Sequence, residues 1–350
     1  MTSMLERCLA DLEARIDPAV EEANQQQWAE FLDGRIEGEV FVPSRPAPKP
    51  SSIDWPNVHI NDAIDDPDQM LLDQFRTPSQ ILADANGGRL SVRCNYGTGI
   101  LPSLLGGELF IMPRETNTLP TTRPLHDTDR VKAVLEAGAP DLHGGLAGRV
   151  FECAERYRDI FARYPKIGRW VELYHPDMQG PIDIVELLWG SEMFLAFHDA
   201  AELLHDVLAL VTETFIRFMH IWQEAAPRAG RHWAHWSVTM AGHVLLPNDS
   251  LMNLSPQAYV EFVRPRDQQI FDEFGGGAIH FCGRGEHFIE AMAQMRGLTA
   301  VHLSQPEYND MEHIYRHTVD KGIKLLALSP QTARRAARPL RGRVHCTTWN

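Results

Sequence analysis

The chain has 350 residues and a mass of 39.6 kDa, which suits one large domain or two ordinary ones. Hydrophobic residues make up 44% of it and charged residues 23%, a composition typical of globular proteins that excludes collagen-like, coiled-coil and mainly disordered chains. The formal net charge of −14 repels phosphate backbones and anionic lipids, so we expect neither nucleic acid nor a membrane as a partner.

The cysteines and the N-terminus indicate a cytoplasmic protein. Five cysteines at widely separated positions are too few and too scattered for a disulfide framework, which fits a reducing compartment. The N-terminal segment is charged and amphipathic and lacks the apolar core of a secretory signal. The sequence has no stretch of about 18 uncharged apolar residues, the length needed to span a membrane.

Residues 1–85 are predicted to form an N-terminal helical arm with a connector. Apolar residues recur at helical spacing over 4–32, and Asp33-Gly34 provides a stop signal. The stretch 43–56 contains five prolines, which exclude a regular element there. A second helix is expected over 66–85.

Residues 86–350 alternate between strand and helix patterns. Helices are expected over 255–274, 285–296, 310–321 and 330–338. Alternation at about 20–35 residues per unit predicts a parallel sheet, either a (β/α)₈ TIM-type barrel or a doubly wound sheet, and eight strand candidates favour the barrel. These candidates are 89–95, 108–112, 168–174, 242–246, 277–282, 298–303, 322–328 and 342–347.

The segment His280-Phe281-Cys282 carries the strongest chemical signal. Strand side chains alternate between faces, so His280 and Cys282 share one face at the carboxyl end of their strand, where barrel enzymes hold their active sites. Cys346 ends the last predicted strand and can reach the same rim, and a His/Cys/Cys set suits a catalytic Zn²⁺. The alternative is that the cysteines are buried apolar residues and His280 is a hydrogen-bonded core histidine.

Residues 242–307 resemble the uroporphyrinogen decarboxylase superfamily. Its members typically have a strand ending in an Asp-rich turn, here LLPNDS, an SP pair that opens a long helix with an internal proline, here LSPQAYVEFVRP, and a strand ending in H-x-C-G, here IHFCG. The upstream segment QGPIDIVELLWG is similar to the GP turn and following helix of that family. The resemblance covers about residues 170–330 and implies a (β/α)₈ barrel.

Within the superfamily, the motif is most similar to the zinc-dependent methyltransferases of the corrinoid and coenzyme M type. This resemblance implies that His280, Cys282 and Cys346 bind zinc and that Glu307 supplies a fourth ligand. The decarboxylases carry an Arg-Gln-Ala-Gly-Arg type segment that grips substrate carboxylates. The sequence lacks that segment, and Arg45 is its only faint counterpart, which argues against porphyrinogen decarboxylation.

Two other residues are candidate catalytic residues at the expected rim. Asp249 follows a predicted strand and would position the substrate, although Asn248-Asp249-Ser250 also suits a turn and helix cap. His175 follows the predicted strand 168–174 and would line the mouth of the barrel.

The leading hypothesis is a zinc-dependent methyltransferase that moves a methyl group between a corrinoid on a partner protein, or another donor, and a thiol or similar small-molecule acceptor. Coordination to zinc converts a thiol to the reactive thiolate near neutral pH. The alternative enzyme is a metal-free, decarboxylase-like lyase that uses Asp249 and rim His and Arg groups on a carboxylated substrate. A third hypothesis is a non-catalytic barrel that binds a corrinoid or a partner.

Overall fold

The computed structural model describes residues 3–227 and 230–347. Its main sheet has six parallel strands in the order β1-β12-β11-β10-β9-β8. A separate parallel pair is formed by β2 (Ser91–Val92) and β5 (Glu172–Leu173). The strands of the main sheet are β1 (Val40–Phe41), β8 (Val244–Pro247), β9 (Gly277–Phe281), β10 (Leu298–Leu303), β11 (Lys324–Leu328) and β12 (Val344–Cys346).

Helices connect the parallel strands and cover their outer side. Apolar side chains that alternate along the strands, such as Ile279, Phe281 and Val301, pack against these helices in the larger hydrophobic cluster. The alternation predicted from the sequence is therefore confirmed. The helices after β5 are α9 (Pro181–Trp189), α10 (Met193–Asp199), α11 (Ala201–Ala225), α12 (Pro256–Ala258), α13 (Arg264–Phe274), α14 (Ile289–Met292), α15 (Met311–His317) and α16 (Pro330–Arg334).

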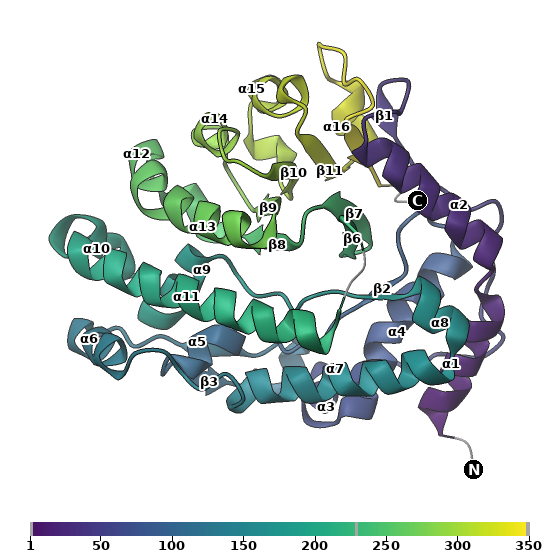
Figure 1. Ribbon diagram of the computed structural model, residues 1–350, viewed down its shortest axis with the longest axis horizontal. Coiled ribbons are helices and arrows are strands. Elements are labelled where there is room, and N and C mark those ends of the chain that lie inside the picture. The colour runs from purple at the N-terminus through teal and green to yellow at the C-terminus, as the bar shows by residue number, and fades with distance from the viewer. Residues whose placement is uncertain (1–2, 228–229, 348–350) are drawn as a thin grey trace.

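The elements are arranged as a ring with an antiparallel hairpin, β6 (His232–His235) and β7 (Val238–Ala241), near its centre (Figure 1). Apolar side chains of this hairpin pack against the inner faces of β8 to β11. Within the described residues, no hydrogen-bonded ladder joins the β2–β5 pair to the six-stranded sheet. The fold is thus a mixed α/β arrangement of TIM type, and the predicted closed barrel is not confirmed.

Three predicted elements differ from the observed ones. Residues 108–112 do not join the parallel sheet, because β3 (Glu108–Phe110) pairs antiparallel with β4 (Thr121–Arg123). The predicted strand 168–174 begins inside α8 (Pro165–Trp170), since Pro165 at the first position starts a helix there. The predicted helix 4–32 is divided at Asp17, which caps the second of two helices, α1 (Met4–Arg15) and α2 (Pro18–Leu32).

The predicted helix over 255–274 is present but contains a π-helical turn over Tyr259–Val263. Pro265 lies two residues after this turn, and a proline inside a helix removes a backbone donor and crowds the preceding turn. A π turn accommodates that disruption without ending the helix.

The region 113–167, which has no clear sequence pattern, contains α6 (Thr128–Ala137) and α7 (Gly145–Arg163), while α5 (Ile100–Leu104) precedes it.

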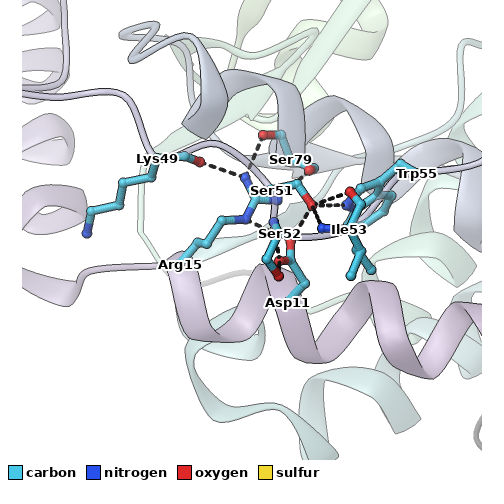
Figure 2. A network of polar contacts seen from close by, with 8 residues as sticks. All are labelled: Asp11, Arg15, Lys49, Ser51, Ser52, Ile53, Trp55 and Ser79. Carbon is cyan, nitrogen blue, oxygen red and sulfur yellow. Dashed lines mark hydrogen bonds and ion pairs between the residues drawn. The ribbon is translucent and has the colours of Figure 1, made fainter.

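The proline-rich connector is anchored by polar contacts to α1 and to α4 (Pro67–Ala83) (Figure 2). Asp11 on α1 accepts hydrogen bonds from the Ser51 hydroxyl at 2.9 Å and from the Ser52 hydroxyl at 2.7 Å. Arg15 donates to the carbonyls of Lys49 at 2.9 Å and Ser79 at 3.0 Å. These contacts order the connector, whose prolines prevent regular structure. The short helix α3 (Ile60–Asp65) follows the connector.

The N-terminal arm docks on its own chain. Glu13 accepts the backbone N–H groups of Lys166 at 3.0 Å and Ile167 at 2.8 Å, at the N-terminus of α8, where a carboxylate is favoured by the free N–H groups and the helix dipole. The arm also contributes β1, which pairs with β12.

In the described part of the chain, no helix has the length and apolar character needed to cross a membrane.

Candidate metal centre

Asp249, His280 and Cys282 meet at the carboxyl ends of β8 and β9. His280 lies on the inner face of β9, two residues after Ala278, which belongs to the inner apolar cluster. Cys282 follows β9 directly, and Asp249 begins the turn after β8. The potential ligand atoms of the three residues all lie within 4.8 Å of one another. The predicted proximity of His280 and Cys282 is therefore observed, and Asp249 joins them.

The two distances from His280 Nε2 to the other donor atoms fit a tetrahedral metal site. His280 Nε2 lies 3.4 Å from Asp249 Oδ1 and 3.4 Å from Cys282 Sγ. With Zn–N and Zn–O bonds of about 2.0–2.2 Å and a Zn–S bond of about 2.3 Å, tetrahedral angles place neighbouring ligand atoms about 3.4–3.6 Å apart. Imidazole, thiolate and carboxylate are all common zinc ligands, so the donor set and its spacing fit Zn²⁺.

The electrostatics of the triad favour a bound cation. Burial, together with the neighbouring Asp249 carboxylate, raises the pKa of the Cys282 thiol to about 11. Burial also lowers the pKa of His280, which favours the neutral imidazole. A divalent cation would reverse the environment of the thiol, because it stabilises the thiolate that the carboxylate disfavours.

Buried carboxyl groups hold the turn that carries Asp249. Asp183 on α9 accepts the backbone N–H groups of Asp249 at 2.6 Å and Ser250 at 2.9 Å. Its burial raises its pKa to about 7. Asp267 on α13 accepts a hydrogen bond from the Asn248 amide at 2.8 Å. Neither Asp183 nor Asp267 was a candidate from sequence, although Asp183 in the mainly apolar run PIDIVELLW was a usable signal.

Asp267 gives the stability of the protein a specific pH dependence. Burial raises its pKa to about 8, whereas an unfolded aspartate titrates near about 3.9. The folded state therefore retains a proton that the unfolded state loses, so this contribution is complete below about pH 4 and declines as the pH rises to about 8, by at most about 1.4 kcal/mol per unit. Asp267→Asn should gain stability relative to wild type between pH 5 and pH 8 in urea unfolding. If the difference in free energy of unfolding between Asp267→Asn and wild type were the same at pH 5 and pH 8, this assignment would be contradicted.

Gly180 is required by close packing beside the same turn. Its N–H donates to the Pro247 carbonyl at 2.6 Å, and a Cβ at this position would lie 2.0 Å from Asn248 Oδ1. We expect Gly180→Ala to lower the free energy of unfolding by about 1–3 kcal/mol, the usual cost of overpacking, and to weaken metal binding by moving Asp249. Urea denaturation tests this. Gly144→Ala, where the nearest atom is 3.9 Å away, is the control and should have a smaller effect.

Trp236 contacts His280 of the triad on one side and the Asp177–Arg93 ion pair on the other. Its ring centroid lies 5.1 Å from that of His280 and 5.4 Å from that of His302. Its indole N–H lies 3.1 Å from both carboxylate oxygens of Asp177, which also forms an ion pair with Arg93. Trp236 occupies the turn of the β6–β7 hairpin at φ 48°, an unusual backbone conformation for a bulky residue that two-residue hairpin turns require.

Cys346 does not belong to the triad. Cys346 pairs with Leu328 and packs with Val344 in the helix-facing cluster, whereas the neighbouring His345 packs on Trp28 inside the ring. The alternation of side chains along β12 therefore points Cys346 away from the inner face that carries His280. The sequence could place Cys346 at the end of a strand but could not fix the face. Its role as a zinc ligand stays a prediction that this arrangement does not support.

Glu307 and His175 also lie away from the triad. Glu307 is exposed on the 3₁₀ turn Pro306–Tyr308 and is not among the grouped ligand residues in the described chain. His175 is buried, accepts the Leu245 N–H at Nε2 at 3.1 Å, and contacts the Pro176 carbonyl through Nδ1 at 2.8 Å. Its imidazole thus bridges the segment after β5 to β8, two strands that are not paired with each other in the described part of the chain. Its catalytic role stays a prediction.

Arg45 is committed to a buried ion pair. Its guanidinium donates to the Glu21 carboxylate at 2.8 and 2.6 Å, and to the Gly88 carbonyl at 2.8 Å. Both side chains are at most 2% exposed. Arg45 therefore joins α2 to the segment before β2 and is not exposed to grip a substrate carboxylate.

Comparisons with known proteins support the fold. No family model matches the chain, and no curated protein is similar enough in sequence to count as a relative. Among solved structures, the chain is similar to a methyltransferase from Methanosarcina mazei, with a TM-score of 0.61 over 88% of this chain and 83% of the other. The two sequences are 17% identical, so the likeness shows a shared fold.

Proposed function

We propose that this protein is a zinc-dependent methyltransferase with Asp249, His280 and Cys282 as protein ligands of the metal. The observation that carries the proposal is the grouping of these three donor atoms within 4.8 Å, with His280 Nε2 at 3.4 Å from each of the other two. The fold shared with a methyltransferase supports the reaction class, and the resemblance to the uroporphyrinogen decarboxylase superfamily supports the position of the site.

Three protein donors leave one position of a tetrahedral zinc site open, as catalytic sites require. Bound zinc would supply a positive charge that keeps an acceptor thiol deprotonated near neutral pH. Asp249 and His280 orient Cys282, whose backbone N–H donates to Asp249 Oδ1 at 3.1 Å. Trp236 covers the inner side of His280 and restricts water from that direction.

A cavity next to the loop that follows β10 can admit a small substrate, although none of the three triad residues lines it. It has a volume of about 670 Å³ and lies at the carboxyl ends of β10 and β11. Ser304 lines it, and its side chain partly offsets the rise in the pKa of the Cys282 thiol. Glu307 lies on the same cavity wall, where it would contact the substrate; as a zinc ligand it would have to move toward the triad. The methyl donor that we propose, a corrinoid carried by a partner protein, rests on the resemblance alone.

The test is methyl transfer from methylcobalamin to a panel of small thiols, followed by the visible spectrum of the corrinoid. Zinc-loaded protein should accelerate loss of the methylcobalamin spectrum with at least one thiol, and chelator-treated protein should not until zinc is restored. Zinc-loaded protein that gives no transfer in either direction with any thiol would reject this donor and acceptor pair. Release of carbon dioxide from a carboxylated substrate by metal-free protein would favour the lyase instead.

A further inference from the structure

We propose that His302 is a positioning residue that fixes the tautomer of His280. Its Nδ1 accepts a hydrogen bond from the Nδ1–H of His280, so that the Nε2 lone pair of His280 is directed at Cys282 and Asp249. The inference rests on the proposed function, because it assigns His280 Nε2 to the metal. His302 lies in the predicted strand 298–303, and its sequence pattern gives no indication of this role.

The two histidines face each other across neighbouring strands. His280 on β9 and His302 on β10 are register partners in the parallel sheet. Both lie on the inner face, each two residues after an alanine of the inner apolar cluster. Their Nδ1 atoms are 2.7 Å apart, a hydrogen-bond distance at which one nitrogen must carry the hydrogen and the other must not.

The surroundings identify His280 as the donor. His280 Nδ1 also lies 3.2 Å from the backbone carbonyl oxygen of His302, and a carbonyl oxygen can only accept. A hydrogen on His280 Nδ1 therefore satisfies both contacts. In a neutral imidazole with Nδ1–H, Nε2 carries a lone pair, and this Nε2 is the atom 3.4 Å from both Cys282 Sγ and Asp249 Oδ1.

Trp236 keeps the two rings in this relation. It meets the His280 ring at an interplanar angle of 89° and the His302 ring at 61°. Its own N–H is held by Asp177, so the indole is not free to rotate away. A partner of this kind, which holds the second nitrogen of a ligand histidine, typically contributes about 10–100-fold to metal affinity.

Two substitutions separate the proposed hydrogen bond from simple packing. His302→Leu fills similar space without an acceptor. His302→Asn places an amide oxygen close to the position of Nδ1 and restores the acceptor. The direct readout is the tautomer of His280 in metal-free protein by ¹⁵N NMR, with its signals assigned by their loss in His280→Gln. Wild type and His302→Asn should show Nδ1–H, whereas His302→Leu should shift toward Nε2–H.

Zinc affinity, measured by competition with a chromophoric chelator, gives the second readout. We expect a loss of about 10–100-fold in His302→Leu and recovery in His302→Asn. Nε2–H at His280 in wild type would overturn the inference, as would unchanged tautomer and affinity in His302→Leu. Because the NMR measurement uses metal-free protein, absence of zinc binding in wild type would reject the proposed function while leaving the tautomer assignment independently decided.

Discussion

Replacing Cys282 by serine should reduce zinc affinity by at least about a hundredfold. Even partners of zinc ligands contribute about 10–100-fold, and this change removes the only thiol in the triad. A serine hydroxyl stays protonated near neutral pH and is a poor ligand for zinc in a site built on a soft donor. Competition with a chromophoric chelator at pH 7.5 measures the effect directly.

Cys346→Ser is the matched control. Cys346 is buried whereas Cys282 is half-buried, and the pKa of each thiol is raised to about 11, but Cys346 packs in the helix-facing cluster. We expect this variant to bind zinc with wild-type affinity. Equal losses in the two variants would show that both thiols coordinate the metal and that the end of β12 adopts another arrangement in the zinc-bound protein.

Arg45→Ala should lower the free energy of unfolding by about 3–5 kcal/mol. Removing one partner of a buried ion pair leaves the other charge buried without compensation. Here the remaining charge is the Glu21 carboxylate, 1% exposed, and the Gly88 carbonyl also loses its donor. Because the pair joins α2 to the segment before β2, chemical denaturation should show a lower midpoint.

The control for this prediction is Arg114→Ala. Arg114 also pairs with one carboxylate through two nitrogens, at 2.6 and 2.7 Å from Asp62, but both side chains are largely exposed. Exposed pairs contribute little because water and salt screen them, so no measurable change in midpoint is expected. A similar loss in both variants would mean that burial does not govern the strength of these pairs.

The repeating part of the fold was accessible from sequence because its signals are local. Apart from His280, Thr299 and His302, strands β9 and β10 consist of apolar residues and glycine, as expected of strands buried on both faces, and Ser255-Pro256 marks a helix start that the structure confirms. His280 and Cys282 were paired correctly since two residues apart on one strand must share a face. Asp249 was predicted to position the substrate, and its meeting with His280 and Cys282 depends on β8 and β9 being neighbours in the sheet.

The remaining parts depend on contacts between distant segments. β1 has only two residues beside a proline-rich connector, so its pairing with β12 leaves no periodic signal. The face of Cys346 is set by the register of β12 against β11, which shifts between Leu325 and Leu328. Trp236 reaches His280 through a hairpin inside the ring, a position that no local pattern encodes.

X-ray absorption at the zinc K edge of wild-type protein tests the central claim most directly, because it counts the sulfur ligands of the bound metal. The proposed centre predicts one zinc per chain with a single sulfur at about 2.3 Å and nitrogen or oxygen ligands at about 2.0–2.2 Å. Two sulfur ligands, or zinc bound with none, would contradict a centre formed by Asp249, His280 and Cys282.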